Sequence, residues 1–235
     1  MSVPRRLKRE LKDWSQRRRF LGIYGLLKEF TMIKPRIYVE NLALAERVRD
    51  LPGCVVECGV WRGGMSAGIG KVMGPQRDYF LFDSFEGLPP AKEIDGKAAM
   101  DWQSDKDSPS YYENCAAGTE FAEKAMALAG IKSFHLKKGW FDKTLPGFKP
   151  PMPIALLRLD GDWYDSTMVC LSHLFDFVTP GGLIVLDDYY TWDGCSRALH
   201  DFLSRRSAAE RIKSLDSVCF LEKKSPAESQ KAASS

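Results

Sequence analysis

Residues 54–70 constrain the fold most, because they join a short apolar run to a glycine turn and then to a helical pattern. The apolar run ends in Glu57, the turn lies between Gly59 and Gly64, and apolar residues then recur at helical spacing. This order predicts a buried strand, a tight turn and a helix, and open parallel sheets bind nucleotide-like ligands outside the carboxyl end of such a strand. The turn lacks the G-x-G-x-x-G spacing of dinucleotide-binding loops, so a plain strand–helix connection is the alternative.

The composition is that of a globular protein. The chain has 235 residues, of which 44% are hydrophobic and 28% charged, enough for one large α/β domain with a core. Its net charge of +3 is too small to indicate a nucleic-acid partner. The six cysteines form no CxxC pair and no metal-ligand spacing, which favours reduced thiols in a cytoplasmic protein. We expect no transmembrane segment and no secretory signal, because no apolar run of about 18 residues is present and the basic N-terminus lacks an apolar core.

The first 50 residues predict a helical extension. Residues 1–19 carry eight basic and two acidic side chains, a local charge of +6, and Leu7, Leu11 and Trp14 share one helical face. We expect this helix to pack on the domain or on a second subunit, as in a homo-oligomer, and a membrane surface or anionic partner is the alternative. Pro35 interrupts the pattern before a second helix at about residues 38–48. The expected division is an extension at residues 1–50, a main domain at 51–224 and a disordered tail at 225–235.

Short apolar runs alternate with helical patterns along the rest of the chain. Strands are expected at about residues 78–83, 131–138, 154–159, 183–186, 211–215 and 217–222, and helices at about 111–129, 166–177 and 195–204. This alternation predicts an α/β fold with a mostly parallel sheet and helices on both faces. Residues 179–182 predict a turn. Residues 84–110 predict a long irregular segment, which we interpret as a lid because long loops in compact domains are usually functional.

An acidic residue ends the second expected strand. Asp83 lies 26 residues after Glu57, close to the spacing at which nucleotide-binding folds place an acid on the ribose hydroxyls. The alternative is an aspartate that only caps the following segment. The spacing therefore makes Asp83 a candidate ligand of a nucleoside.

Acidic residues also follow the fourth and fifth strands. Asp160 follows the fourth, and Asp187 and Asp188 follow the fifth. If these strands are neighbours, their ends lie about 5 Å apart, and crowded carboxylates raise one another's pKa unless a cation neutralises them. Oxygen ligands without His or Cys favour a hard ion such as Mg²⁺ or Ca²⁺. The alternative is that all three residues only cap the segments that follow them.

Five motifs in a fixed order resemble one known family. They are ECGVWRGG from Glu57, DSFEGLP from Asp83, KGWFDKTLP from Lys138, LRLDGDWYDST from Leu157 and PGGLIVLDDY from Pro180. Over roughly residues 30–223 the chain resembles the macrocin O-methyltransferase family. The resemblance implies a Rossmann-like class I methyltransferase fold with a seven-stranded sheet whose last strand is antiparallel. It also implies S-adenosylmethionine as methyl donor, a divalent metal that is usually Mg²⁺, and a small-molecule acceptor hydroxyl on a sugar or glycosylated natural product.

The resemblance assigns roles to residues of each motif. Asp83 is similar to the family's ribose ligand, and Asp160, Asp187 and Asp188 are similar to its metal ligands. The other positions similar to the family's cofactor site are Thr31, Met32, Ile33, Glu57, Gly59, Gly63, Gly64, Ser66, Ser84, Phe85, Gly139, Trp140 and Phe141. One position departs from the pattern, because the family often has serine directly after the double glycine and this chain has Met65 there, with Ser66 next.

Methyl transfer to an alcohol requires activation of its hydroxyl group. A metal that binds the hydroxyl lowers its pKa, and chelation suits a vicinal diol such as a sugar or a catechol. Related catechol-type enzymes place a lysine shortly after the first metal aspartate, whereas residues 161–164 contain none. The expected catalytic base is therefore a carboxylate, Asp160 or Asp162. A catechol-like or other diol acceptor, and a non-catalytic binding module on the same fold, are the alternatives.

Overall fold

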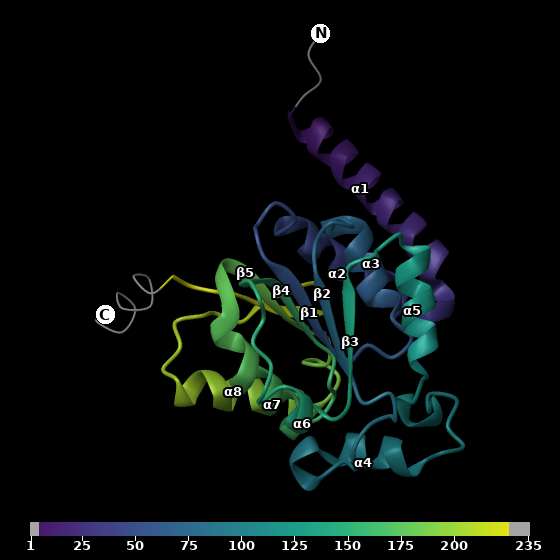
Figure 1. Cartoon of the computed structure of the whole chain (residues 1–235), viewed down its shortest axis with the longest axis vertical. Coiled ribbons are helices and arrows are strands. Elements are labelled where there is room, and N and C mark those ends of the chain that lie inside the picture. The colour runs from purple at the N-terminus through teal and green to yellow at the C-terminus, as the bar shows by residue number, and fades with distance from the viewer. Residues whose placement is uncertain (1–4, 226–235) are drawn as a thin grey trace.

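A seven-stranded sheet forms the centre of the structure, a computed structural model that describes residues 5–225 (Figure 1). The strands follow the order β3-β2-β1-β4-β5-β7-β6, and β7 runs antiparallel to both of its neighbours. All other pairings are parallel, which confirms the mostly parallel sheet. The strands are β1 (Cys54–Cys58), β2 (Tyr79–Asp83), β3 (Phe134–Lys138), β4 (Ile154–Leu159), β5 (Val178–Leu186), β6 (Lys213–Leu215) and β7 (Val218–Glu222).

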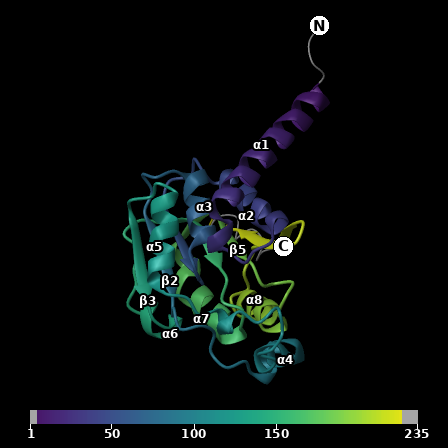
Figure 2. The same cartoon turned by 90° about the vertical axis from the view of Figure 1, so that its right-hand side faces the viewer.

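Helices cover both faces of this sheet (Figures 1 and 2). On one face lie α2, α3 and α5, and on the other lie α6, α7 and α8. The helices are α1 (Arg5–Leu27), α2 (Pro35–Arg47), α3 (Gly64–Met73), α4 (Lys97–Ser104), α5 (Thr119–Leu128), α6 (Phe141–Thr144), α7 (Tyr164–Leu174) and α8 (Asp193–Arg205). Within the described part of the chain, no helix is long and apolar enough to cross a membrane.

The alternation of side chains along the strands builds two hydrophobic cores. Val55 of β1 packs with the layer of α2, α3 and α5, while Val56 packs with the layer of α7 and α8. Every residue of β1 and β4 is buried, as expected for central strands that are covered on both faces. Two charged residues interrupt these apolar strands, because Glu57 and Arg158 are each 1% exposed and face each other across β1 and β4.

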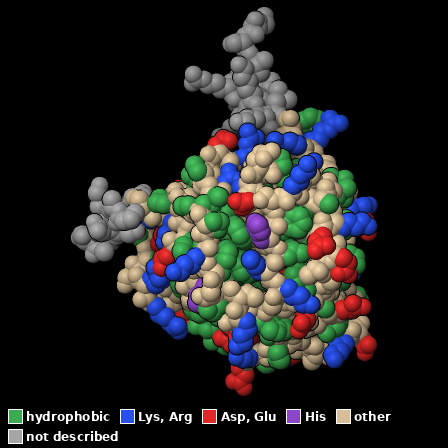
Figure 3. Space-filling model, in the orientation of Figure 1, with side chains coloured by type: hydrophobic (Ala, Val, Ile, Leu, Met, Phe, Trp, Pro, Cys, Tyr) green, Lys and Arg blue, Asp and Glu red, His purple; other side chains and the backbone are tan. Residues whose placement is uncertain are grey.

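The N-terminal segment is partly built into the layered fold. Phe20 and Leu27 of α1 are buried, whereas Trp14 is 62% exposed where the helix projects from the body (Figures 1 and 2). Basic side chains gather on the surface near the base of α1 (Figure 3). Pro35 takes the first turn of α2, a position where its missing N–H removes no helical hydrogen bond. The Tyr38 hydroxyl of α2 donates to the carbonyl oxygen of Gly64 at 2.8 Å, which ties this helix to α3.

The segment expected to be irregular contains a helix. Within residues 84–110, α4 begins after Gly96, whose φ of 89° turns the chain into the helix. The helix expected at residues 111–129 is shorter, because Glu113, Asn114 and Cys115 all have positive φ and break the helical pattern before Thr119. The tail expected to be disordered lies outside the described residues from residue 226 onward.

The glycine-rich stretch before Leu183 is part of a strand and not a turn. Ile154 of β4 pairs with Val178, and Leu156 pairs with Leu183, so residues 179–182 form a bulge in β5. An added Cβ on Gly182 would lie 3.0 Å from the carbonyl oxygen of Ala155 on β4. The glycine therefore allows the two backbones to approach each other, which its turn-like sequence context did not indicate.

Gly59, directly after β1, offers a test of this close packing. Its φ is +90°, and an added Cβ would lie 1.7 Å from the carbonyl oxygen of Asp160, whereas Gly181 has a φ of +81° and open space around it. We expect Gly181→Ala to lower the free energy of unfolding by about 1–2 kcal/mol, the cost of a left-handed backbone alone. Gly59→Ala adds a steric clash, so this variant should lose clearly more free energy of unfolding in the same denaturant titration. Equal losses would show that the strands adjust freely at Gly59.

Candidate active site

A cavity of about 970 Å³ opens at the carboxyl edge of the sheet. Residues that follow β1, β2, β4 and β5 line it, together with N-terminal residues 30–34 and residues 87–90 of the segment after β2. Open α/β sheets bind their ligands at this edge, and the volume lies at the upper end of the range for small-molecule sites. The cavity is therefore large enough for a nucleoside-sized donor together with an acceptor.

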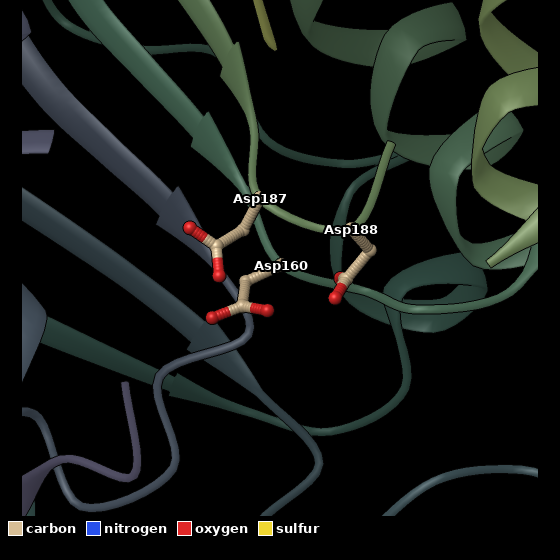
Figure 4. A group of neighbouring side chains, drawn as sticks. All are labelled: Asp160, Asp187 and Asp188. Atoms are coloured by element: carbon tan, nitrogen blue, oxygen red, sulfur yellow. The ribbon is translucent and has the colours of Figure 1, made fainter. Parts of the chain in front are cut away.

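Three aspartates meet at the edge of this cavity (Figure 4). The Asp160 N–H donates to the carbonyl oxygen of Cys58, and the Asp187 N–H donates to that of Leu159, so the strand ladder fixes both residues. One carboxylate oxygen from each of Asp160, Asp187 and Asp188 lies within 4.8 Å of the others. The expected proximity of these residues is confirmed, because β4 and β5 are parallel neighbours.

A buried arginine lies beside the aspartates. The Nη1 atom of Arg158 donates to Oε1 of Glu57 at 2.6 Å and to Oδ2 of Asp160 at 2.9 Å. Its Nη2 atom lies 2.7 Å from Oδ1 of Asp187, an ion-pair contact outside hydrogen-bonding geometry. One cation thus offsets part of the charge of three acids. It engages one oxygen of Asp160 and one of Asp187, and leaves the second oxygen of each for another partner.

Helices α2 and α3 complete this network. Asn41 of α2 donates its amide hydrogen to Oδ1 of Asp187 at 3.2 Å and accepts from Nε of Arg158 at 3.1 Å. Ser66 of α3 donates to Oε2 of Glu57. Burial raises the pKa of Glu57 to about 7, although the charge of Arg158 opposes the shift. Helix α2 therefore helps to position Asp187 at the end of β5.

Asp162 faces the same cavity from the loop after β4. Its φ of 56° is a left-handed conformation that Asp tolerates better than most residues. Trp192 Nε1 donates to Oδ1 of Asp162 at 2.9 Å, and the Asp162 N–H donates to Oδ2 of Asp188 at 3.1 Å. Burial, followed by the charge of Asp160, raises the pKa of Asp162 to about 8. Such a carboxyl group can exchange a proton near neutral pH.

The three clustered aspartates fit a hard divalent cation. Burial raises the pKa of Asp160 against the opposing charge of Arg158. Burial, followed by the charges of Asp162 and Asp160, raises the pKa of Asp188 well above its usual range. A cation among these oxygens would offset their repulsion, and a donor set of carboxylates without His or Cys suits Mg²⁺ better than zinc.

Asp83 lies at the carboxyl end of β2 and organises the loop after β1. Its Oδ2 atom accepts the N–H groups of Val60 and Trp61 at 2.7 and 2.8 Å, and Oδ1 accepts that of Phe85 at 2.7 Å. A carboxylate offers about four acceptor positions, and these three N–H groups take three of them. Asp83 also lines the cavity, so its carboxylate orders the loop after β1 at the wall of the ligand site.

Some of the residues expected at the cofactor site line the cavity, and others do not. Those that line it are Thr31, Met32, Ile33, Glu57, Gly59, Asp83, Ser84, Trp140 and Phe141, and those outside the lining are Gly63, Gly64, Ser66, Phe85 and Gly139. The double glycine packs against protein, because an added Cβ would lie 2.7 Å from the Cα of Ala122 at Gly63, or 2.5 Å from the carbonyl oxygen of Phe30 at Gly64. Gly139 donates its N–H to the carbonyl oxygen of Asp83.

Sequence reasoning did not identify four residues of the site. They are Asn41, Cys115, Arg158 and Trp192. Arg158 had a usable signal, because a charged side chain within an otherwise apolar central strand requires an ionic partner. The other three lie on α2 and in loops, where nothing in the local pattern indicates which side chains face the strand ends.

The segment between β2 and α5 is held against the cavity by polar contacts. Asn114 donates from Nδ2 to the carbonyl oxygen of Leu88 at 2.7 Å, and Gln103 donates from Nε2 to Oδ1 of Asn114 at 2.9 Å. Asp95 joins this segment to α7, because its Oδ1 atom accepts the N–H of Tyr164 at 2.7 Å. The segment is therefore ordered by its own side chains and by contacts with the body, which include this carboxylate at the start of α7 and the Trp163 indole, which donates to the carbonyl oxygen of Pro89 at 2.8 Å.

A seven-stranded sheet of this order, with a ligand cavity over its central strands and acids at the strand ends, defines a class I methyltransferase. The chain belongs to the macrocin-O-methyltransferase (TylF) family, whose sequence model matches residues 5–224. This membership assigns the protein to the O-methyltransferases.

Individual relatives and solved structures agree with this assignment. The 8-demethyl-8-(2,3-dimethoxy-alpha-L-rhamnosyl)-tetracenomycin-C 4'-O-methyltransferase of Streptomyces olivaceus is 34% identical over 187 residues, 76% of this chain and 67% of that protein. The mycinamicin III 3''-O-methyltransferase of Micromonospora griseorubida is 33% identical over 178 residues, 72% of this chain and 68% of that protein. The O-methyltransferase NovP has a TM-score of 0.70 at 25% identity over 83% of each chain. The calicheamicin methyltransferase CalS11 shares the fold, with a TM-score of 0.60 at 19% identity over 94% of each chain.

Replacement of Arg158 tests the central network. Arg158→Met leaves Glu57 buried without its cation, and we expect the free energy of unfolding to fall by about 3–5 kcal/mol, as when one partner of a buried ion pair is removed. Arg205→Met is the matched control, because Arg205 pairs with Asp201 at 3.6 Å and its side chain is 68% exposed. Its loss should cost about 1 kcal/mol or less. The free energy of unfolding of both variants is measured by denaturant titration. Similar losses of this free energy in the two variants would contradict a special role for Arg158.

Proposed function

We propose that this protein is an S-adenosylmethionine- and Mg²⁺-dependent O-methyltransferase that acts on a sugar hydroxyl. The proposal is carried by the convergence of Asp160, Asp187 and Asp188 on a cavity that extends to the glycine turn after β1. The relative from Streptomyces olivaceus is named for 4'-O-methyl transfer on a rhamnosyl tetracenomycin, which supports a sugar as the acceptor.

The donor would lie over the ends of β1 and β2. S-adenosylmethionine supplies an electrophilic methyl group on a sulfonium when it is bound. The chain around Gly59 lines this part of the cavity, Asp83 would accept from the ribose hydroxyls, and Trp140 and Phe141 would lie beside the adenine. In-line transfer requires the acceptor oxygen at about 3 Å from the methyl carbon. The acceptor hydroxyl must therefore lie between this part of the cavity and the three aspartates.

The acceptor would lie over the ends of β4 and β5. A divalent cation held by Asp160, Asp187 and Asp188 would supply Lewis acidity, which lowers the pKa of an alcohol. We assign the role of proton acceptor to Asp162, which lines the cavity and accepts from Trp192 through Oδ1. A bound cation would favour the ionised form of its carboxyl group. Asp160, the other candidate base, already accepts a hydrogen bond from Arg158 through one oxygen and is itself one of the residues that would hold the cation.

Removal of the cation tests the metal role. We expect EDTA to abolish methyl transfer and Mg²⁺ to restore it. Asp188 makes no ion pair with Arg158, so Asp188→Asn spares the buried network. In calorimetry with Mn²⁺ as the probe for the cation site, this variant should bind about 10–100-fold or more weakly than the unmodified protein. The free energy of unfolding of this variant and its affinity for S-adenosylhomocysteine should remain unchanged.

The matched control for this experiment is Asp176→Asn, since the Asp176 side chain is 62% exposed and outside the cavity. It should bind Mn²⁺ like the unmodified protein. Full activity in protein confirmed to be free of metal would remove the cation from the mechanism.

Replacement of Asp83 tests the donor site. Asp83→Ala removes a charged acceptor for the ribose hydroxyls, and binding of S-adenosylhomocysteine should weaken by about 1.5–3 kcal/mol. Asp78 lies just before the opposite end of β2, where it accepts from the Ser133 hydroxyl, so Asp78→Ala should leave binding unchanged. Because Asp83 also orders the loop after β1, the free energy of unfolding of Asp83→Ala is measured in parallel. An unchanged affinity in a folded Asp83→Ala protein would exclude Asp83 from the donor site.

A further inference from the structure

Three tryptophans meet beside the cavity. Trp102 belongs to α4, whereas Trp163 and Trp192 directly precede α7 and α8. The ring centroid of Trp192 lies 6.0 Å from that of Trp102 and 5.4 Å from that of Trp163, and the third pair is 6.3 Å apart. The interplanar angles lie between 58° and 66°, as in favourable aromatic pairs. The cluster therefore joins the segment between β2 and α5 to the starts of both helices.

Two of the three indole N–H groups hold this segment. Trp102 donates from Nε1 to the carbonyl oxygen of Ser110 at 3.0 Å, and Trp163 donates from Nε1 to that of Pro89 at 2.8 Å. Both acceptors are backbone atoms of the segment between β2 and α5. The indole of Trp192 differs, because it donates to a charged side chain, the carboxylate of Asp162.

Trp192 and Asp188 hold Asp162 together. The backbone N–H of Trp192 donates to the carbonyl oxygen of Asp188 at 2.9 Å, and Asp188 accepts the Asp162 N–H through Oδ2 at 3.1 Å. The Trp192 indole donates to Oδ1 of Asp162 at 2.9 Å, and Oδ2 of Asp162 accepts no hydrogen bond from any residue in the described part of the chain. The terminal torsion of an aspartate is broad, so a carboxylate turns readily unless a hydrogen bond restrains it. The indole is therefore the restraint on this carboxylate.

The two outer indoles of the cluster lie behind the cavity wall. Trp102 and Trp192 are not among the described residues that line the cavity, although Asp162 is. Trp192 is partly buried and packs against the core beneath α7 and α8, and Trp102 is partly buried as well. A ligand in the cavity would touch neither ring, so any effect of these rings on the reaction passes through their neighbours.

From these contacts we propose that Trp192 is a positioning residue for Asp162 and that Trp102 holds the Trp192 ring in place. The inference rests on the proposed function, in which Asp162 accepts the proton. The Trp192 N–H fixes one carboxylate oxygen, and the other remains free for the acceptor hydroxyl. The segment between β2 and α5, whose residues 87–90 line the cavity, thereby also supports the proton acceptor.

Turnover distinguishes the role of the N–H group from that of the ring. Methyl transfer from labelled S-adenosylmethionine to p-nitrophenyl α-L-rhamnoside is the probe reaction. Trp192→Phe keeps a ring but loses the N–H, so kcat should fall about tenfold or more while KM for S-adenosylmethionine stays unchanged. Trp102→Ala should lower kcat in the same way, and Trp102→Phe should retain most of the activity, because this position supplies only a ring. Trp14→Phe is the matched control, since Trp14 is 62% exposed on α1.

A double-mutant cycle tests whether Trp192 acts through Asp162. In an Asp162→Asn protein the proton acceptor is already lost, so Trp192→Phe should lower kcat little further. Full additivity of the two losses would overturn the inference, as would an unchanged kcat in Trp192→Phe alone, and both results would leave the proposed function standing. Full activity of Asp162→Asn alone would instead refute the proposed proton acceptor.

Hydrogen exchange of the indole N–H groups provides an arm that needs no acceptor. In the ¹⁵N-labelled protein, the Trp192 indole signal is assigned by its absence from Trp192→Phe, and the other indole signals report whether each variant is folded. We expect the Trp192 indole hydrogen to exchange with water at least about tenfold faster in Asp162→Ala and in Trp102→Ala, and at an unchanged rate in Trp14→Phe. Unchanged exchange in Asp162→Ala or in Trp102→Ala would overturn the inference, even if the rhamnoside is not methylated. An unmodified protein that binds no S-adenosylhomocysteine would refute the proposed function itself.

Discussion

The buried ion pair between Arg158 and the acids around it is the interaction on which the rest of the site depends. The parallel register of β1 and β4 places Glu57 opposite Arg158 inside the sheet, where each side chain is 1% exposed. A guanidinium is planar and carries several donors in a fixed arrangement, so it can contact Glu57, Asp160 and Asp187 at once. A lysine at this position would place its three donors on one nitrogen, whereas Arg158 meets these carboxylates from two nitrogens.

This network links parts of the molecule that are distant in sequence. Asn41 belongs to the N-terminal helices, yet it lies between Arg158 and Asp187 and hydrogen-bonds to both. Ser66 belongs to the helix after the glycine turn and donates to Glu57. The donor side and the acid side of the cavity are therefore joined through β1 and β4. The N-terminal segment is a structural part of the site as well as an extension of the chain.

The sequence predicted those features that follow from periodicity and strand ends. The run at residues 154–159 predicts β4 because it is apolar apart from Arg158, and the acids after β4 and β5 are predicted to meet because parallel strands end at one edge. Long-range packing was not predictable. Gly63 and Gly64 resemble a ligand cradle in sequence but give space to Ala122 and Phe30, and residues 179–182 resemble a turn but form a bulge. Their local sequences permit both structures, and only the neighbouring chain decides between them.

The segment between β2 and α5 stabilises itself through Asn114 and Gln103. It joins the body away from the Arg158 network, at Asp95, at Lys92 and at the carbonyl oxygen of Pro89. Such an arrangement separates two kinds of evolutionary change. Substitutions that retain these few contacts can reshape the acceptor wall while the buried charges keep their geometry. A lineage of such enzymes can therefore diversify the molecules it modifies by changing this segment, provided that Trp102 keeps its packing against Trp192, the residue that donates to Asp162.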